Sequence, residues 1–156
     1  MKNIVTHETE VKKDSFKTAI VVSEYNPRIT NALLKGAIDF LEKVNLETIE
    51  VFKTAGAFEI PFVCKKIFSA QKADGIVALG AVIRGDTPHF DYVCAETASG
   101  IMNVSLEAEK PIAFGILTTD NIEQAIKRAS EDDNNKGHEA AESLWKTLCL
   151  IKKAKL

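Results

Sequence analysis

Short runs of β-branched and other apolar residues alternate along the chain with longer stretches whose apolar side chains recur at helical spacing. The runs at residues 17–23, 48–52, 75–81 and 112–117 predict four short strands. The clearest helical pattern covers residues 27–44, where one face carries Ile29, Leu33, Ala37, Phe40, Leu41 and Val44. Alternating strands and helices of this kind predict a parallel sheet with helices on both faces, a three-layer α/β/α sandwich.

Prolines, capping residues and a polar segment indicate where the other helices begin and end. Pro61 suits the first turn of a helix running to about residue 71, since the ring removes an N–H that would have no helical partner. A long helix is expected over residues 89–109, ended by Pro111. Asp120-Asn121-Ile122-Glu123 resembles a capping box that begins a further helix. A polar break at residues 130–135 precedes a final helix from Lys136 or Gly137 to residue 153.

The chain reads as one domain over residues 1–156, without a linker or a repeat. Residues 1–16 have no strong pattern and are either a tail or an edge strand lent to a neighbouring subunit. Right-handed crossovers place the four strand-to-helix connections, residues 24–27, 53–61, 82–88 and 118–121, on one edge of the sheet. Ligands of open α/β sheets bind at this edge, so it is where we expect the site.

His89 stands at the third connection, directly before a helix, and its imidazole exchanges protons near neutral pH. The residue is either catalytic or an ordinary surface or core histidine, and spacing alone leaves both open. Gly85-Asp86-Thr87 either offers backbone amides to an anion or forms a plain turn with a helix cap. His7 and His138 carry no such positional argument, and no histidine or cysteine pair has metal-ligand spacing, so no metal is expected.

Aromatic and charged residues fall on the same predicted edge. Tyr25 closes the first strand and either stacks on a planar ring or packs inside the protein. Phe58 and Glu59 lie in the second connection, where Glu59 either accepts hydrogen bonds from hydroxyl groups or favours the dipole of the next helix. Arg128 either binds a phosphate group or satisfies the end of its own helix, and Lys136 is similarly ambiguous.

Composition excludes several classes of protein. Hydrophobic residues make up 46% of the 156 residues and the formal net charge is -2, without a basic stripe, which disfavours disorder and nucleic-acid binding. No apolar run approaches the roughly 20 residues of a membrane span, and residues 1–10 lack a signal-peptide core. Cys64, Cys94 and Cys149 are expected to be buried free thiols of a cytoplasmic protein.

Five motifs in order give the chain a family resemblance: Tyr25-Asn26, the segments 56–61, 80–92 and 114–125, and Arg128 with residues 135–137. From about residue 16 to 150 the sequence resembles the lumazine synthases of riboflavin biosynthesis. The resemblance implies a flavodoxin-like fold and condensation of 5-amino-6-(D-ribitylamino)uracil with 3,4-dihydroxy-2-butanone 4-phosphate. The products would be 6,7-dimethyl-8-ribityllumazine, phosphate and water. It implies no cofactor, since neither electrons nor hydride are transferred.

The resemblance also implies a role for each matching residue. Tyr25 would stack on the pyrimidine, Ala57, Phe58 and Glu59 would bind ring and ribityl chain, and Phe114 would line the pocket from a neighbouring subunit. Backbone groups of Ala81, Val82 and Ile83 would face the pyrimidine. The amides of Asp86 and Thr87, with Arg128, would hold the phosphate. His89 would transfer protons, and Lys136 would lie near the substrates.

Three departures from the family pattern stand out: Asp86 where a small residue is common, Tyr25 in place of Phe or Trp, and the acidic stretch 130–134. The family forms pentamers or sixty-subunit shells, so a homo-oligomer is implied, with riboflavin synthase as a further partner. Two alternatives to the enzyme stay open at this point. One is a flavin- or lumazine-binding module without turnover, and the other is a shell protein that encloses a partner. Retention of His89 together with Arg128 favours the enzyme.

Overall fold

A computed structural model describes residues 2–132 and 134–156; Met1 and Asp133, the latter in the polar break, lie outside the described residues. Four parallel strands form one sheet in the order β2-β1-β3-β4. The strands are β1 (Thr18–Ser23), β2 (Ile49–Thr54), β3 (Gly75–Ile83) and β4 (Ile112–Thr119). The helices are α1 (Pro27–Val44), the 3-10 helix η1 (Ala57–Glu59), α2 (Ile60–Ser69), α3 (His89–Ala108), α4 (Ile122–Arg128) and α5 (Lys136–Ala154).

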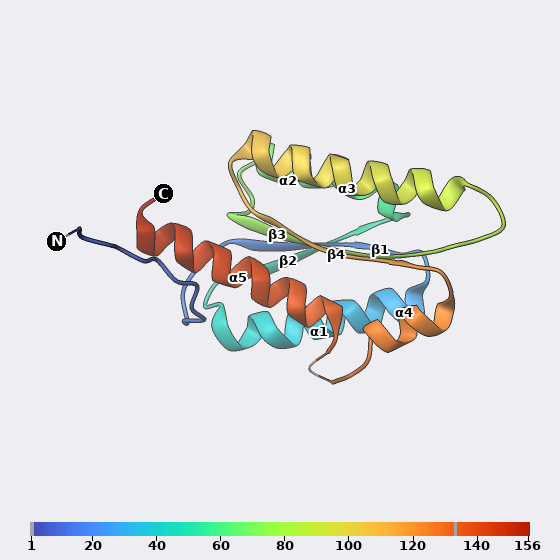
Figure 1. Cartoon of the computed structure of the whole chain (residues 1–156), viewed down its shortest axis with the longest axis horizontal. Coiled ribbons are helices and arrows are strands. Elements are labelled where there is room, and N and C mark those ends of the chain that lie inside the picture. Colours follow the sequence, from blue (N-terminus) through green and yellow to red (C-terminus); the bar gives the residue numbers. More distant parts are fainter. Residues whose placement is uncertain (1, 133) are drawn as a thin grey trace.

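The sheet is the middle of three layers, with α2 and α3 on one face and α1, α4 and α5 on the other (Figure 1). A hydrophobic core lies on each face of the sheet. Because side chains alternate along a strand, each strand contributes side chains to both cores. Ile20 and Val22 of β1 belong to the core under α1 and α5, which also holds Leu33, Leu144 and Trp145. The core under α2 and α3 holds Ala19, Val21, Ile60, Cys64 and Ile101. The strand order is that of flavodoxin-like proteins, which confirms the predicted fold class.

β3 and β4 are each two residues longer than predicted. Val82 pairs with Thr118 and Ile83 with Thr119, and the N–H of Arg84 donates to the carbonyl oxygen of Thr119 at 2.9 Å. The expected loop at residues 82–88 therefore begins only after Ile83. β2 likewise extends to Thr54, because its ladder with β1 continues to the pair Ser23 and Thr54. The polar ends of β2 and β4 are held by backbone pairing, whereas Val82 and Ile83 at the end of β3 also pack against the two cores.

One helix start confirms the prediction and another differs from it. Residues 57–59 form a separate 3-10 turn before α2, whose first turn holds Pro61 as predicted and which ends at Ser69. At α4 the cap is Asn121, whose Oδ1 accepts a hydrogen bond from the N–H of Gln124 at 2.9 Å. The side chain of Gln124 in turn accepts from the N–H of Asp120 at 2.9 Å. The capping box is thus shifted by one residue from the one expected.

The start of α5 is capped by Asn135, a buried residue that also joins α5 to α1. Its Oδ1 accepts from the N–H groups of Gly137 and His138 at 2.8 and 3.2 Å. Its Nδ2 donates to the carbonyl oxygens of Ala32 at 3.1 Å and Ser130 at 2.8 Å. The helices approach so closely that a Cβ on Gly137 would lie 2.0 Å from the carbonyl oxygen of Leu33. Only glycine fits there.

The N-terminal segment runs extended beside the C-terminal half of α5 (Figure 1). In the described residues it forms no strand of this subunit's sheet, only an isolated bridge between Asp14 and Asn45. The indole of Trp145 and ion pairs from Lys152 and Lys153 hold it. Residues 10–16 are therefore docked on α5, whereas residues 2–9 are exposed, and pairing with a neighbouring subunit stays a prediction.

The three cysteines are free in the described part of the chain, but the expectation that all are buried was wrong. Cys64 alone is buried, and burial raises the pKa of its thiol to about 12. Cys94 and Cys149 are half-buried, because each sits at the flank of its helix rather than under it. No helix in the described residues combines the length and apolar character needed to cross a membrane.

Candidate active site

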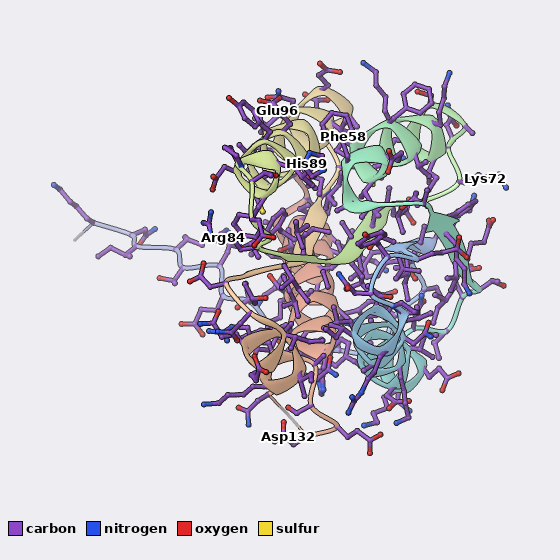
Figure 2. All side chains as sticks on the ribbon, turned by 90° about the vertical axis from the view of Figure 1, so that its right-hand side faces the viewer. Phe58, Lys72, Arg84, His89, Glu96 and Asp132 are labelled. Atoms are coloured by element: carbon purple, nitrogen blue, oxygen red, sulfur yellow. The ribbon has the colours of Figure 1, made fainter. Side chains whose placement is uncertain are left out.

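The carboxyl ends of the strands and the loops that follow them face the viewer in Figure 2, where Phe58, Arg84 and His89 are labelled. Three of the predicted connections bring side chains of the expected kind to this edge. They are the turn after β1, the η1 turn after β2, and the loop between β3 and α3. This arrangement follows from parallel strands joined by right-handed crossovers.

The turn after β1 carries one exposed aromatic ring and one half-buried amide side chain. Tyr25 is 72% exposed, so the tyrosine is not a packed core residue. Asn26 adopts the left-handed conformation (φ 57), which asparagine tolerates better than most residues. Its Nδ2 donates to the carbonyl oxygen of Ala81 at 2.9 Å. Asn26 thus fixes the turn that carries Tyr25 against the end of β3, a role that sequence reasoning missed.

The η1 turn presents an aromatic ring and a carboxylate from one short segment. Ala57 is buried, whereas Phe58 is 57% exposed. The Oε2 atom of Glu59 accepts a hydrogen bond from the N–H of Gly56 at 2.9 Å, closing the turn on itself. One carboxylate oxygen of Glu59 is therefore already bound within the turn. The acceptance of hydrogen bonds from hydroxyl groups by the other oxygen stays a prediction.

The last residues of β3 leave backbone groups open on one side. β1 pairs with β3 only as far as Leu79, whereas β4 pairs with it through Ile83. Because successive residues direct their backbone groups to alternate sides of a strand, Val82 and Arg84 bond towards β4 and Ala81 and Ile83 face the β1 side. Asn26 takes the carbonyl of Ala81. The backbone N–H and C=O of Ile83 point into the space beyond the end of β1.

The loop from Gly85 to Pro88 is exposed and leads straight into α3. Among the described residues nothing lies within 4 Å of where a Cβ on Gly85 would stand, and no glycine has positive φ. The backbone conformation of this turn therefore does not require glycine at position 85. The Oγ1 atom of Thr87 accepts a long hydrogen bond from the N–H of His89 at 3.4 Å. Asp86, Thr87 and His89 are all exposed.

Arg84 was not singled out from the sequence, yet it makes the densest contacts at this edge. Its Nε donates to Oδ1 of Asp120 at 3.0 Å and its Nη1 to Oδ1 of Asp91 at 3.1 Å. The guanidinium carbon lies 4.2 Å from the centroid of the Phe90 ring. The bonds to Asp120 and then Asp91 raise the pKa of the Arg84 guanidinium, which stays charged. Asp120 is 36 positions away in the sequence, so no local pattern signals the pair.

Three further candidates gather in a different place. Phe114, Arg128 and Lys136 line a cleft of about 340 Å³ along the outer edge of β4, between α4 and α5. Nη1 of Arg128 donates to the carbonyl oxygen of Gln124 at 3.1 Å, and Nζ of Lys136 pairs with Glu139 at 2.6 Å. The described lining of this cleft contains neither Tyr25, η1 nor the loop before α3. One subunit therefore presents two separate groups of candidate residues.

No three histidine, cysteine, aspartate or glutamate side chains come together at metal-binding distance in residues 2–132 and 134–156. An open flavodoxin-like sheet with exposed aromatic and polar groups at its carboxyl edge defines an α/β protein that binds a small ligand there.

Comparison with known proteins gives the family. The family model described as 6,7-dimethyl-8-ribityllumazine synthase matches residues 15–152. A relative from Desulfovibrio desulfuricans bearing that name is 45% identical over 150 residues, covering 95% of this chain and 96% of the relative. The chain belongs to the 6,7-dimethyl-8-ribityllumazine synthase family. It is an enzyme of the transferase class with the lumazine synthase activity of riboflavin biosynthesis.

Proposed function

We propose that the protein condenses 5-amino-6-(D-ribitylamino)uracil with 3,4-dihydroxy-2-butanone 4-phosphate at the carboxyl edge of its sheet. The observation that carries this proposal is the presence of His89 and the exposed loop at residues 85–88 beside the η1 turn, in a chain of this family. In the reaction the amine of the pyrimidine attacks the ketone and an imine forms with loss of water. Phosphate is then eliminated, and the ribitylamino nitrogen attacks the remaining carbonyl group, so that the ring closes with loss of a second water.

The pyrimidine binds between the first two connections and the end of β3. The exposed ring of Tyr25 stacks on the heterocycle, and Phe58 covers it with its own exposed face. Glu59 accepts from the ribityl hydroxyl groups, and buried Ala57 packs beneath them. Of the strand segment 81–83, Ile83 supplies the N–H and C=O that read the pyrimidine edge, since Asn26 already occupies the carbonyl of Ala81. Val82 lines the wall.

The second substrate binds at the start of α3. The backbone amides of Asp86 and Thr87 hold its phosphate, aided by the positive end of a helix 20 residues long. His89 moves protons during imine formation and phosphate elimination, steps that suit an imidazole near neutral pH. Holding two reactive molecules together supplies much of the rate gain, so His89 assists rather than carries the whole reaction.

Phe114, Arg128 and Lys136 act across a subunit boundary. In one chain they line a cleft separate from the strand-end loops, which supports their serving the site of a neighbouring copy. There Phe114 closes the heterocycle pocket, Arg128 adds a guanidinium to the phosphate site, and Lys136 lies close by. The protein is then a homo-oligomer, a pentamer or a sixty-subunit shell. Association with riboflavin synthase and a cytoplasmic location stay predictions.

The test is a product assay with purified protein and both substrates, run against a control without protein because the condensation proceeds unaided. We expect lumazine to form well above that background. Light scattering on the same sample gives particle size, and an isolated monomer would contradict the shared site. Binding of both ligands without acceleration would contradict the proposed roles and point to Asp86 and Tyr25, the two departures from the family pattern.

A further inference from the structure

Arg84, which follows β3, contacts the end of β4 and the first turn of α3. Its backbone N–H bonds Thr119 at the end of β4, and its side chain bonds Asp120 just beyond and Asp91 in the first turn of α3. The guanidinium also stacks on Phe90, itself a buried residue of that turn. Among the described residues, Arg84 is thus the contact that fixes how α3 begins relative to the ends of β3 and β4.

This contact sets the direction of His89. The loop 85–88 is exposed, so the placement of the helix start depends on what holds its first turn. Two residues along an α-helix differ by about 200° around its axis, so His89 and Asp91 point to nearly opposite sides. The bond between Asp91 and Arg84 therefore directs the imidazole of His89 and the amides before it away from β4 and towards β1. The backbone groups of Ile83 face the same, β1 side.

Arg84 also removes negative charge from the neighbourhood of the proposed phosphate site. Asp91 lies within the first turn of α3 and Asp120 next to it, and both carboxylates bond the same guanidinium. Asp86 already adds one exposed carboxylate to the loop. With Arg84 absent, two more unpaired carboxylates would oppose a phosphate dianion at this helix start, where like charges repel it. The planar fork of arginine suits this double pairing, whereas lysine offers one point charge.

We propose that Arg84 is a positioning residue for the condensation, which orients His89 and keeps the start of α3 receptive to the phosphate of the second substrate. Arg84 touches neither substrate; it acts through Asp91, Asp120 and Phe90. The inference rests on the proposed function, in that the phosphate is placed at residues 86–87.

The experiment compares Arg84→Gln, Arg84→Met and Arg84→Lys with Lys72→Gln as the matched control. Lys72 also pairs with one carboxylate, Glu50 at 3.3 Å, and lies over an aromatic ring, Phe52 at 5.8 Å. It sits at the opposite side of the view in Figure 2. Arg84→Met keeps an unbranched side chain over Phe90 while losing both ion pairs. Exposed ion pairs contribute little stability, so each variant should fold, and melting temperatures check this.

Steady-state kinetics should show different effects on the KM values of the two substrates. Arg84→Gln and Arg84→Met should raise KM for the butanone phosphate about tenfold, lower kcat about tenfold, and leave KM for the pyrimidine within about twofold. The inhibition constant of inorganic phosphate should rise by a similar factor. Arg84→Lys should recover part of each loss, and Lys72→Gln should match the unmodified protein. Folded Gln and Met variants with unchanged constants, or with equal rises in both KM values, would overturn the proposal.

Calorimetric binding of inorganic phosphate distinguishes failure of this inference from failure of the proposed function. If the unmodified protein shows no turnover above background, the proposed reaction fails, yet phosphate binding still tests Arg84. Weaker phosphate binding by Arg84→Gln than by Lys72→Gln then supports the positioning role. Equal phosphate binding by these two variants overturns it.

Discussion

The indole Nε1–H of Trp145 donates a hydrogen bond to the carbonyl oxygen of Lys12 at 2.7 Å, joining positions 133 apart in the sequence. Trp145 is fully buried, and Phe16 meets its ring edge-on with centroids 5.1 Å apart. The N-terminal segment is thus fastened to α5 by a buried aromatic residue. Since the chain has a single tryptophan, its fluorescence reports directly on this attachment.

Docking of the N-terminal segment should weaken in acid. Hydrogen bonds from Lys12 and then Lys153 lower the pKa of Glu10 from 4.5 to about 2, and one from Lys152 lowers the pKa of Asp14. A carboxyl whose folded pKa is depressed stabilises docking above its unfolded pKa, and this contribution is lost as pH falls through the folded value. We expect Trp145 emission to change between pH 4.5 and 2, with far-UV circular dichroism following the rest of the fold.

The control for this transition is the double variant Lys152→Ala/Lys153→Ala, which removes two of the cations that lower these pKa values. Without these cations the pKa values of Glu10 and Asp14 differ less between the docked and the detached segment, so Trp145 emission should change less between pH 4.5 and 2. If both proteins show the same change, these ion pairs do not govern the attachment.

His89→Ala should slow lumazine formation by about tenfold or more, because proton transfer by a positioned side chain typically contributes at least that much. Residual activity should remain well above background, since the substrates are still held together. His7→Ala is the matched control, a histidine in the exposed N-terminal segment. Particle size should be unchanged in both variants. A His89→Ala rate equal to that of the control would remove His89 from its proposed role.

Arg128→Ala should raise KM for the butanone phosphate about tenfold and affect KM for the pyrimidine much less, because the guanidinium is proposed to contact only the phosphate. The adjacent cation in the last turn of α4 provides the control, Lys127→Ala. Steady-state kinetics with each substrate varied in turn measures the split. Equal changes in both KM values would argue against a phosphate contact.

Sequence patterns sufficed for the parallel three-layer architecture and for the edge at which the loops meet, whereas the flavodoxin-like topology came from the family resemblance. The β-branched runs, Pro61 and the helical spacing of α1 are local signals, and handedness of the crossovers does the rest. The same rules placed Tyr25, Phe58 and His89 on one edge, and each is exposed there. Strand ends were less predictable, because Thr118 and Thr119 pair through backbone groups that carry no hydrophobic signal, and the apolar pair Val82 and Ile83 stands directly before a polar loop.

The supporting contacts of the site could not be predicted, because they join distant positions through polar groups. Asn26 reaches Ala81 across 55 positions, and Arg84 reaches Asp120 across 36. Nothing near Arg84 in the sequence distinguishes it from a solvated arginine at a strand end. The cleft holding Phe114 and Arg128 likewise depends on how α4 and α5 pack beside β4. Such contacts are visible only once the tertiary structure brings the partners together.

Asn135→Ala should destabilise the fold more than loss of an ordinary helix cap. Asn135 is 4% exposed and its amide makes four hydrogen bonds, two to the start of α5 and two to the carbonyl oxygens of Ala32 and Ser130. Alanine removes the cap and leaves partly buried carbonyls without donors, at a combined cost of about 3 kcal/mol in the free energy of unfolding.

Asn121→Ala is the matched control for that variant, since Asn121 caps the exposed start of α4 with one hydrogen bond and should cost about 1 kcal/mol. Asn135→Asp keeps the acceptor that caps α5 but loses the donor to Ala32 and Ser130, so it should fall between the two. Urea unfolding of all three variants at one protein concentration measures the difference, because assembly shifts apparent stability. If Asn135→Ala and Asn121→Ala lose the same free energy, the bonds from Asn135 to Ala32 and Ser130 add nothing to the cap, and α1 and α5 are held by apolar packing and the close approach at Gly137 alone.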